Sequence, residues 1–495
     1  MRLAAGGALC AALLTLMLAA AAHANTRQET LVQDDRTLLF SGPAVRERAL
    51  DQISALGTEG IHSLVFWGRI APNALSRHKP HFNATNPADY PAQAWDVYDD
   101  LVRSTSARGL KLLLTPTGAM PAWASRCHGR ISLLQDCRPS PHEFGMFMVA
   151  LAKRYSGRYH DENQGGGVLP RVRRWSVWNE PNQGGWLKPQ YTRRHGHLVA
   201  AAPSIYRGLV RAAVHALRAH RHRHDQILLG ETAPIGRTRG RPLTRPISPV
   251  SFYRDLFCIN SHGHVLRGRA ARRLSGCRHF HRLRVTGVAH HPYTRGGYQT
   301  PRNRGRHGWV TLSSVSRLER VLDRAAHHHR IRRAAPIWYT ELGYQTRPPD
   351  PYGVSLRRQA AYINESNWLA YRTHRVRSIA QYQLFDEPER AVFNTGLRFA
   401  GGRDKPSLRA FRTPLWVSGS HHRVVVFGQV RPAARGRVVR IQFRHRGHHY
   451  RTLARVRLRN PRGYFVRHFM PRRGYWRLAW TSAAGHRVHS RTAHR

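Results

Sequence analysis

Short apolar runs alternate with longer amphipathic segments over residues 30–411 of the 495-residue chain. The run Leu110–Leu114 contains four leucines, which is typical of a parallel strand buried on both faces of a sheet. The segment Ala44–Leu56 instead places Leu50 and Ile53 three residues apart, which predicts a helix with one buried face. Strand-like and helix-like segments in alternation predict an α/β fold, a (β/α)8 barrel with eight parallel strands.

The predicted strands differ in length but follow one another at spacings that leave room for a helix or a long loop. In chain order they are Thr30–Val32, Ile61–Trp67, Leu110–Leu114, Arg171–Trp178, Gln226–Glu231, Val285–Tyr293, Ile337–Glu341 and Ser378–Phe385. The longest predicted helix, Thr192–His220, lies between the fourth and fifth strands.

The pattern changes after about residue 413, where short runs recur at roughly ten-residue spacing. This spacing predicts a small all-β sandwich behind the barrel. The runs are Val424–Gln429, Val438–Phe443, His449–Val456, Tyr464–Phe469 and Tyr475–Trp480. We therefore expect a barrel over residues 25–412 and a sandwich over residues 413–495. Tyr450, Tyr475 and Trp476 favour a glycan-binding role for the sandwich, and a spacer or wall-attaching role is an open alternative.

Two of the predicted barrel strands end in a glutamate. Asn179-Glu180-Pro181-Asn182 ends the fourth strand, because Pro181 cannot continue a ladder, and Glu341 ends the seventh. The carboxyl ends of barrel strands meet at one mouth, where such enzymes carry their active sites. Two glutamates there suit double-displacement hydrolysis of a glycosidic bond. The structural alternative is a surface turn that happens to hold an Asn-Glu pair.

These motifs carry a resemblance to a known family. Trp178–Asn182 (W-N-E-P-N) and Trp338–Thr346 (W-Y-T-E-L-G-Y-Q-T), followed by Pro348-Pro349-Asp350, resemble the clan-A retaining glycoside hydrolases. Families 39 and 5 are the most similar, especially cellulase-like or xylosidase-like secreted proteins of high-GC bacteria. The resemblance covers about Thr30 to Phe411 and implies action on a polysaccharide or oligosaccharide, probably β-linked.

The resemblance also implies roles for single residues. Glu180 would be the general acid/base and Glu341 the nucleophile, while Asn179 would hydrogen-bond the sugar 2-hydroxyl. His291 and Tyr293 would line the −1 subsite, and the Tyr293 hydroxyl would orient the nucleophile. Two tryptophans are further candidates for contact with the sugar, although packing explains a lone aromatic residue equally well: Trp67 and Trp186.

Three positions depart from the family pattern. His62 stands on the second strand where members usually have an arginine that pairs with the nucleophile. Gln383 and Phe385 stand on the eighth strand where a tryptophan often lies under the sugar. These departures affect the expected substrate more than the expected fold.

The first 24 residues predict a secretory signal peptide. Arg2 precedes the largely apolar run Ala8–Ala22, and Ala22-His23-Ala24 is a small-x-small cleavage site. The run is too short and wrongly flanked for a membrane anchor, and no other run predicts a transmembrane segment. We therefore expect an exported protein.

Four cysteines follow the leader: Cys127, Cys137, Cys258 and Cys277. In an exported protein they suggest two disulfides, for which three connectivities are possible. We favour the local pairs Cys127–Cys137 and Cys258–Cys277, because each would close one predicted loop. No spacing is of the C-x2-C type, so a zinc site is weakly supported, and neither a metal nor a cofactor is expected.

The net charge of +54 is the feature least expected of a glycosidase. Only five of the 81 basic residues are lysines, so the excess is almost entirely arginine. Codon bias in a GC-rich genome is one explanation, and attraction to an anionic cell-wall polymer is another. The charge supports a rival function, that of a non-catalytic cell-surface protein that binds the wall. A specific nucleic-acid partner has only bulk charge in its favour and no binding motif.

Overall fold

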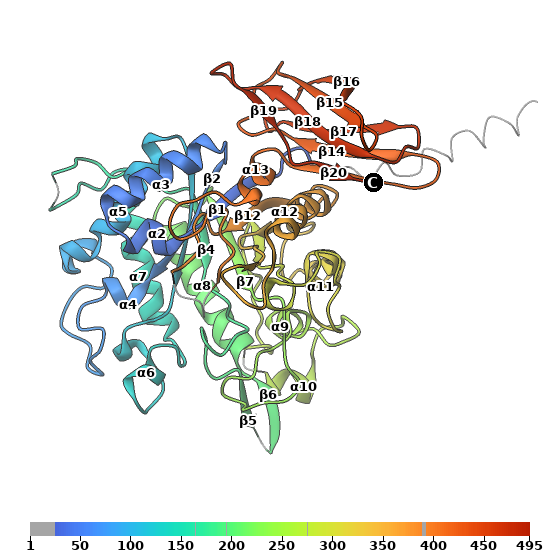
Figure 1. The fold of residues 1–495 in the computed structure, drawn as a ribbon. Coiled ribbons are helices and arrows are strands. Elements are labelled where there is room, and N and C mark those ends of the chain that lie inside the picture. The colour runs from blue at the N-terminus through green and yellow to red at the C-terminus, as the bar shows by residue number, and fades with distance from the viewer. Residues whose placement is uncertain (1–24, 164, 195, 275, 389–392) are drawn as a thin grey trace, which may run out of the picture.

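The computed structural model describes residues 25–163, 165–194, 196–274, 276–388 and 393–495, so the predicted signal peptide lies outside the described residues. Eight parallel strands close into a barrel, in the spatial order β1, β2, β3, β4, β7, β8, β9 and β12 (Figure 1). Their bounds are Glu29–Gln33, Gly60–Phe66, Lys111–Thr117, Arg174–Val177, Gln226–Thr232, Gly287–His290, Ile337–Tyr339 and Val376–Tyr382. The expected (β/α)8 barrel is confirmed.

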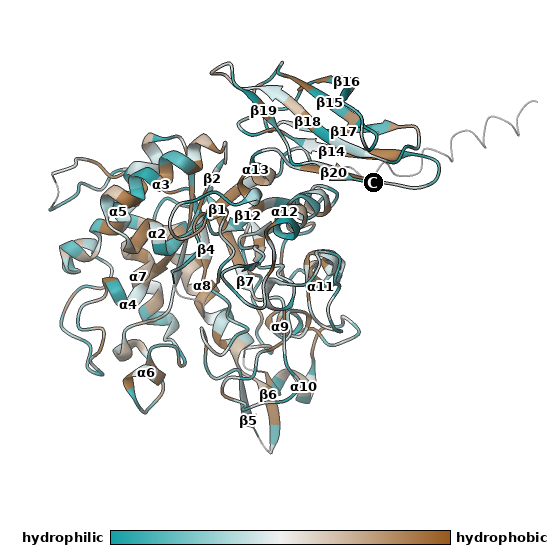
Figure 2. Ribbon diagram, in the orientation of Figure 1, coloured by the Kyte–Doolittle hydropathy of each residue, from teal (hydrophilic) through white to brown (hydrophobic). Residues whose placement is uncertain are grey.

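Helices surround the barrel, and most carry hydrophobic and hydrophilic residues along their length (Figure 2). The longer ones are α3 (Pro43–Ala55), α5 (Asp96–Ala107), α7 (Pro141–Arg154), α8 (Ala202–Ala219), α9 (Pro249–Leu256), α11 (Ser316–His327), α12 (Leu356–Tyr371) and α13 (Pro406–Arg412). The shorter ones are α2 (Asp35–Phe40), α4 (Trp67–Ile70), α6 (Ile131–Leu134) and α10 (Gly268–Arg273).

The predicted helix Thr192–His220 is wrong at its start. Two paired antiparallel strands, β5 (Tyr191–Arg194) and β6 (His197–Ala200), precede α8, which begins only at Ala202. The segment contains the β-branched Thr192 and Val199, which favour strands. Pro203 in the first turn of α8 suits a helix start, because its missing N–H would have no partner there.

The barrel is filled by side chains, as a packed core. One interior layer is formed by apolar residues from six strands: Leu31, Leu113, Leu228, Ala289, Trp338 and Ala380. Below this layer, Glu29 at the start of β1 accepts hydrogen bonds from Arg174 at 2.6 Å and from Lys111 at 2.7 Å. The apolar layer and this ion network close the end of the barrel opposite the strand tips, so the tips supply the open face.

The C-terminal strands form two antiparallel sheets, which confirms the expected all-β sandwich. One sheet has the order β13 (Leu415–Gly419), β14 (Val424–Gln429), β17 (Tyr464–Phe469). The other has the order β16 (Arg451–Arg457), β15 (Val438–Arg444), β18 (Tyr475–Thr481), β19 (Arg487–His489), with β20 (Ala493–His494) also on β18. The first strand and the last two were not predicted.

The sandwich packs against α12 and α13 of the barrel (Figure 1). Trp368 and Tyr371 of α12 form one buried cluster with Phe427 and Tyr464 of the sandwich. Because aromatic side chains bury a large apolar surface, this cluster stabilises the contact between the barrel and the sandwich.

Both predicted disulfides are present in the structure, Cys127–Cys137 and Cys258–Cys277. The second joins the end of the α9 region to the loop after α10, and the first closes the loop that follows β3. Among the described residues, no helix combines the length and the apolar composition that crossing a bilayer requires.

Candidate active site

Glu180 lies just beyond β4, at the open end of the barrel. The chain turns sharply there, with positive φ at Trp178 (60°) and at Glu180 (36°), a conformation that costs free energy and clusters at functional sites. Hydrogen bonds hold the turn: Trp178 Nε1 donates to the Trp186 carbonyl at 3.0 Å, and the Asn179 amide donates to Thr117 Oγ1 at 3.0 Å. The Glu180 side chain keeps 21% of its surface exposed, so it faces the solvent-accessible mouth.

Glu341 lies two residues beyond β9 and reaches the same mouth. Carboxylate oxygens of Glu180 and Glu341 and a ring nitrogen of His291 all lie within 4.8 Å of one another. The side chain of Glu341 is 11% exposed, and the Tyr293 hydroxyl donates to its Oε2 at 3.4 Å. Residues far apart in sequence, from three different strand tips, therefore converge on one point.

His291 lies at the centre of this group and is completely buried. Its Nδ1 is 3.1 Å from Glu180 Oε1 and 3.4 Å from Glu341 Oε2, so one nitrogen contacts both carboxylates. Its Nε2 lies 2.8 Å from Oε2 of a third carboxylate, Glu231. Burial lowers the pKa of His291, but the three carboxylates outweigh burial and raise it well above the usual value. The ring is therefore an imidazolium that donates from both nitrogens.

Glu231 was not predicted as a site residue, although it ends the predicted fifth strand. Its backbone has φ of 44°, and its carbonyl accepts a hydrogen bond from the Glu180 amide at 2.9 Å. The preceding Gly230 has φ of 123°, and a Cβ there would lie 2.3 Å from the Ala289 carbonyl oxygen. Only glycine fits this close approach, which interrupts the β7–β8 pairing and accompanies the inward position of Glu231.

Glu231 is a permanent anion beneath the imidazolium. Burial raises the pKa of its carboxyl, but His62 and His291 outweigh burial and bring it to about 2. Its Oε2 also accepts a hydrogen bond from Thr340 Oγ1. The hydrogen bond to this carboxylate fixes Nε2 of the His291 ring, so that Nδ1 points at Glu180 and Glu341.

His62 occupies the position where the resemblance implied an arginine for the nucleophile. It lies 3.9 Å from Glu231 instead, and contacts the Thr340 carbonyl at 3.0 Å and Thr115 Oγ1 at 2.9 Å. Burial lowers its pKa despite the nearby carboxylates, so the ring is neutral. A carbonyl can only accept, so Nδ1 carries the proton of His62.

The charges around the barrel mouth keep one of its carboxyl groups protonated at neutral pH. Burial, and next the neighbouring carboxylates Glu180 and Glu231, raise the pKa of Glu341 to about 8 against the opposing effect of His291. Like charges held this close cannot all ionise at neutral pH. The two mouth carboxyls thus combine one acidic proton with a negative charge.

Two further side chains border the same mouth. Asn179 is 3% exposed, and its Oδ1 accepts no hydrogen bond from the described residues, which leaves a buried acceptor free for a ligand hydroxyl. Tyr382, at the end of β12, was not predicted as a site residue. Burial and the charge of Glu341 raise its pKa well above the usual value, so its hydroxyl stays neutral beside the carboxyls.

The structure does not bring Trp67 to this group. Its ring is completely buried and stacks on Phe147 of α7 at a centroid distance of 5.5 Å, so it presents no surface to a sugar. Trp186 is partly exposed in the loop after β4 and stays a candidate. Just beyond the end of β12, Gln383 donates to Glu387 Oε1 at 2.6 Å, and Phe385 packs against the main hydrophobic core.

The spacing of Glu180, His291 and Glu341 also suits a metal ion, but their hydrogen bonding does not. A histidine ligand must offer a lone pair from a neutral ring. Both nitrogens of His291 instead donate to carboxylates, and its raised pKa keeps them protonated. The arrangement therefore fits proton transfer better than metal binding.

No protein-family model matches the chain, and no curated protein matches it. Similar solved structures include glycoside hydrolases. A family 39 glycoside hydrolase from the gut symbiont Bacteroides cellulosilyticus WH2 has a TM-score of 0.48 and 14% identity, over 91% of this chain and 80% of that one. GH5_18 from Streptomyces cattleya, in complex with GlcNAc, has a TM-score of 0.45 and 14% identity, over 78% of each chain. Fpglu1 from Fervidobacterium pennivoraus has a TM-score of 0.45 and 12% identity, over 78% of this chain and 95% of that one. At 12–14% identity, the similarity of these three structures to this chain is one of backbone fold.

Proposed function

We propose that the protein is a glycoside hydrolase that cleaves a β-linked O-glycosidic bond by double displacement with retention of configuration. The observation that carries the proposal is the pair Glu180 and Glu341, from the tips of β4 and β9, with oxygens within 4.8 Å of each other. Retaining enzymes hold their carboxyl groups about 5–5.5 Å apart, whereas inverting enzymes hold them about 6.5–9.5 Å apart. The separation leaves no room for a water between attacking group and sugar.

Glu180 would act as the acid and Glu341 as the nucleophile. In the first step the shared proton lies on Glu180, and Glu341 is ionised beside the His291 imidazolium. Glu180 gives this proton to the glycosidic oxygen, as Glu341 Oε2 forms a bond to the sugar carbon and the leaving group departs. In the second step Glu180 takes a proton from water, and the resulting hydroxide displaces Glu341. Glu180 suits the acid role because it is the more exposed of the two and so reaches the leaving group.

The neighbours support this division of roles. The Tyr293 hydroxyl donates to Glu341 Oε2 and would orient it for attack, while Asn179 would bind the 2-hydroxyl of the sugar. The imidazolium of His291 stabilises whichever carboxylate is ionised, so charge can move between Glu180 and Glu341 during the reaction without an uncompensated buried anion.

Replacement of each glutamate tests the proposal. Glu180→Gln and Glu341→Gln are each expected to lower kcat/KM on an aryl β-glycoside on the order of 10³-fold or more. Glu47→Gln, on the exposed face of α3, is the matched control and should retain activity. Proton NMR of the first product should show the anomer of the substrate. Release of the opposite anomer would refute the retaining mechanism, and full activity of Glu341→Gln would refute the assignment of the nucleophile.

We also propose that the protein is exported. The two disulfides favour an oxidising compartment, and the predicted signal peptide would direct the chain there. The rival function, a wall-binding protein without catalysis, is supported by the net charge. Binding to wall polymers with no turnover of any glycoside in a broad panel would favour that rival.

A further inference from the structure

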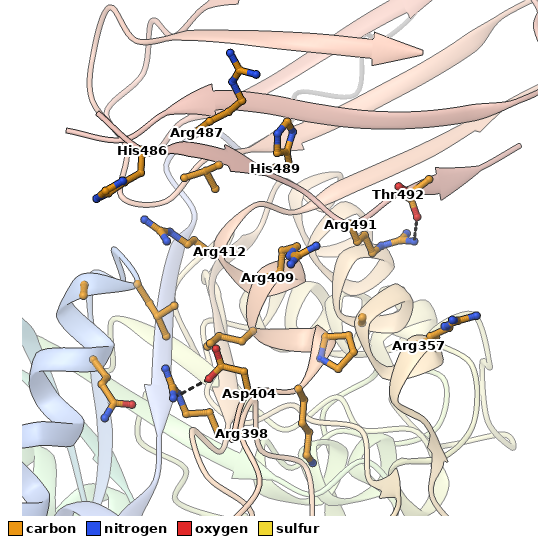
Figure 3. Close-up of a pocket in the computed structure, with 18 residues that line it drawn as sticks. Arg357, Arg398, Asp404, Arg409, Arg412, His486, Arg487, His489, Arg491 and Thr492 are labelled. Atoms are coloured by element: carbon orange, nitrogen blue, oxygen red, sulfur yellow. Dashed lines mark hydrogen bonds and ion pairs between the residues drawn. The ribbon is translucent and has the colours of Figure 1, made fainter. Parts of the chain in front are cut away.

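A large cavity lies between the barrel and the sandwich, with a volume of about 1330 Å³. The end of α3, the start of α12 and the helix α13 line it from the barrel, and β19 and the residues after it line it from the sandwich (Figure 3). None of the residues described at the barrel mouth lines it. The cavity is therefore a separate feature that exists only because the two parts pack together.

The lining is strongly basic. It contains six arginines and a lysine, and Asp404 is its single carboxylate. The arginines are Arg357, Arg398, Arg409, Arg412, Arg487 and Arg491. Asp404 forms an ion pair with Arg398, whose Nη1 lies 2.7 Å from Asp404 Oδ1. Lys405 forms another ion pair, with Asp386, at 2.7 Å.

Arg409 and Arg412 lie in the middle of the cavity, one turn apart on α13 (Figure 3). Neither forms an ion pair with a carboxylate of the described residues, and Arg412 Nε is buried without a hydrogen-bond partner among them. Across the cavity, burial and then the surrounding guanidinium groups, Arg487 and Arg409 among them, lower the pKa of His489. The charges of Arg409 and Arg412 are therefore not compensated by a carboxylate within the described parts of the chain.

Guanidinium groups bind oxyanions through pairs of parallel N–H donors. A small anion would contact two or three of the arginines, whereas a chain with regularly spaced charges can contact all of them in a cavity of this size. We propose that this cavity binds an acidic polysaccharide, whose carboxylate or sulfate groups pair with Arg409 and Arg412. The choice of a polysaccharide over other polyanions rests on the proposed glycosidase function.

Binding without turnover tests this proposal independently of catalysis. The full chain with Glu341→Gln serves as the background, so that loss of hydrolysis does not affect the result. Polygalacturonate and dextran sulfate are the carboxylate and sulfate probes, and dextran is the neutral probe, each titrated by calorimetry near physiological salt. We expect binding to at least one acidic probe and none to dextran.

Two double variants separate the cavity from the general charge of the protein. Arg409→Gln with Arg412→Gln should weaken binding of the acidic probe about 10-fold, as expected for the loss of two ion pairs. Arg223→Gln with Arg333→Gln removes the same charge from exposed positions outside the cavity and should change the dissociation constant less than about 3-fold. Thermal unfolding of both variants confirms that each is folded.

Three outcomes would overturn the proposal. An equal loss in both double variants would assign binding to bulk charge. If the protein binds neither acidic polysaccharide, acidic polysaccharides are excluded as ligands of this cavity, whether or not the wild-type protein hydrolyses glycosides. Tighter, Arg409-dependent binding of inorganic polyphosphate would assign the cavity to a phosphate polymer instead.

Discussion

Glu231 offers the sharpest test of how the site is held together. We consider Glu231→Gln, which keeps the shape of the side chain and removes its charge. The carboxylate is completely buried, 2.8 Å from His291 Nε2, and its pKa is lowered from an ordinary 4.5 to about 2. A lowering of this size corresponds to about 3 kcal/mol of unfolding free energy. The substitution removes the attraction between this carboxylate and the two imidazole groups that lower its pKa, His62 and His291, of which His291 is the nearer.

The pH dependence follows from the same lowering. A carboxyl with a depressed pKa in the folded state stabilises the protein fully above pH 4.5. The stabilisation is lost as the pH falls from 4.5 to about 2, because the unfolded chain takes up the proton first. Urea unfolding should therefore show a deficit of about 3 kcal/mol for Glu231→Gln at neutral pH, and this deficit should shrink across that acidic window.

A matched control is available in Glu365, which is buried beside Arg302 but has a raised pKa, because burial outweighs the arginine. Glu365→Gln should leave the slope between pH 4.5 and about 2 unchanged, since a raised pKa affects stability only at higher pH. A deficit for Glu231→Gln below about 1 kcal/mol at neutral pH, or one that persists undiminished at the acidic end, would refute the proposed ion pair.

Three further predictions concern catalysis and the core. The kcat/KM of the wild type should fall as the pH rises through about 8, where the two mouth carboxyls lose the proton that they share and no acid is left for the leaving group, and a profile flat to pH 10 would contradict this shared proton. Tyr293→Phe removes the hydrogen bond to Glu341 and should lower kcat/KM about 10-fold without a change in melting temperature; a parallel loss of stability would indicate a packing role instead. Asp99→Asn should cost about 3–5 kcal/mol in urea unfolding, because it leaves Arg154 as a buried cation without its nearest partner, and a cost under about 1 kcal/mol would show that this pair contributes little.

The strand tips show why part of the site was predictable from sequence. The local sequence determines where a strand that runs into Asn-Glu-Pro ends, because proline cannot continue the hydrogen-bond ladder. Parallel strands in a closed barrel must present their carboxyl ends at one face. Glu180 and Glu341 could therefore be expected at the same mouth before any coordinates existed, and the structure places their oxygens within 4.8 Å of each other.

Glu231 and Trp67 show where local pattern was insufficient. Both end a predicted strand, yet one side chain turns into the barrel and the other away from it. Glu231 is directed inward by the irregular backbone at Gly230, which depends on how closely the neighbouring strand approaches. Trp67 begins the short helix α4, which places its ring against Phe147. Neither orientation can be derived from hydrophobic periodicity, because both result from packing between distant segments.

The amino-acid sequence by itself determined the barrel, the sandwich behind it and the two glutamates at strand ends, because alternation, turn residues and strand boundaries are local properties. Only the tertiary structure decided which groups surround those glutamates. His291 acquires its charge from three carboxylates on three different strands, and the arginine-lined cavity exists only where α13 meets the sandwich. Charge states and cavities depend on distances between remote residues, and the folded chain alone sets those distances.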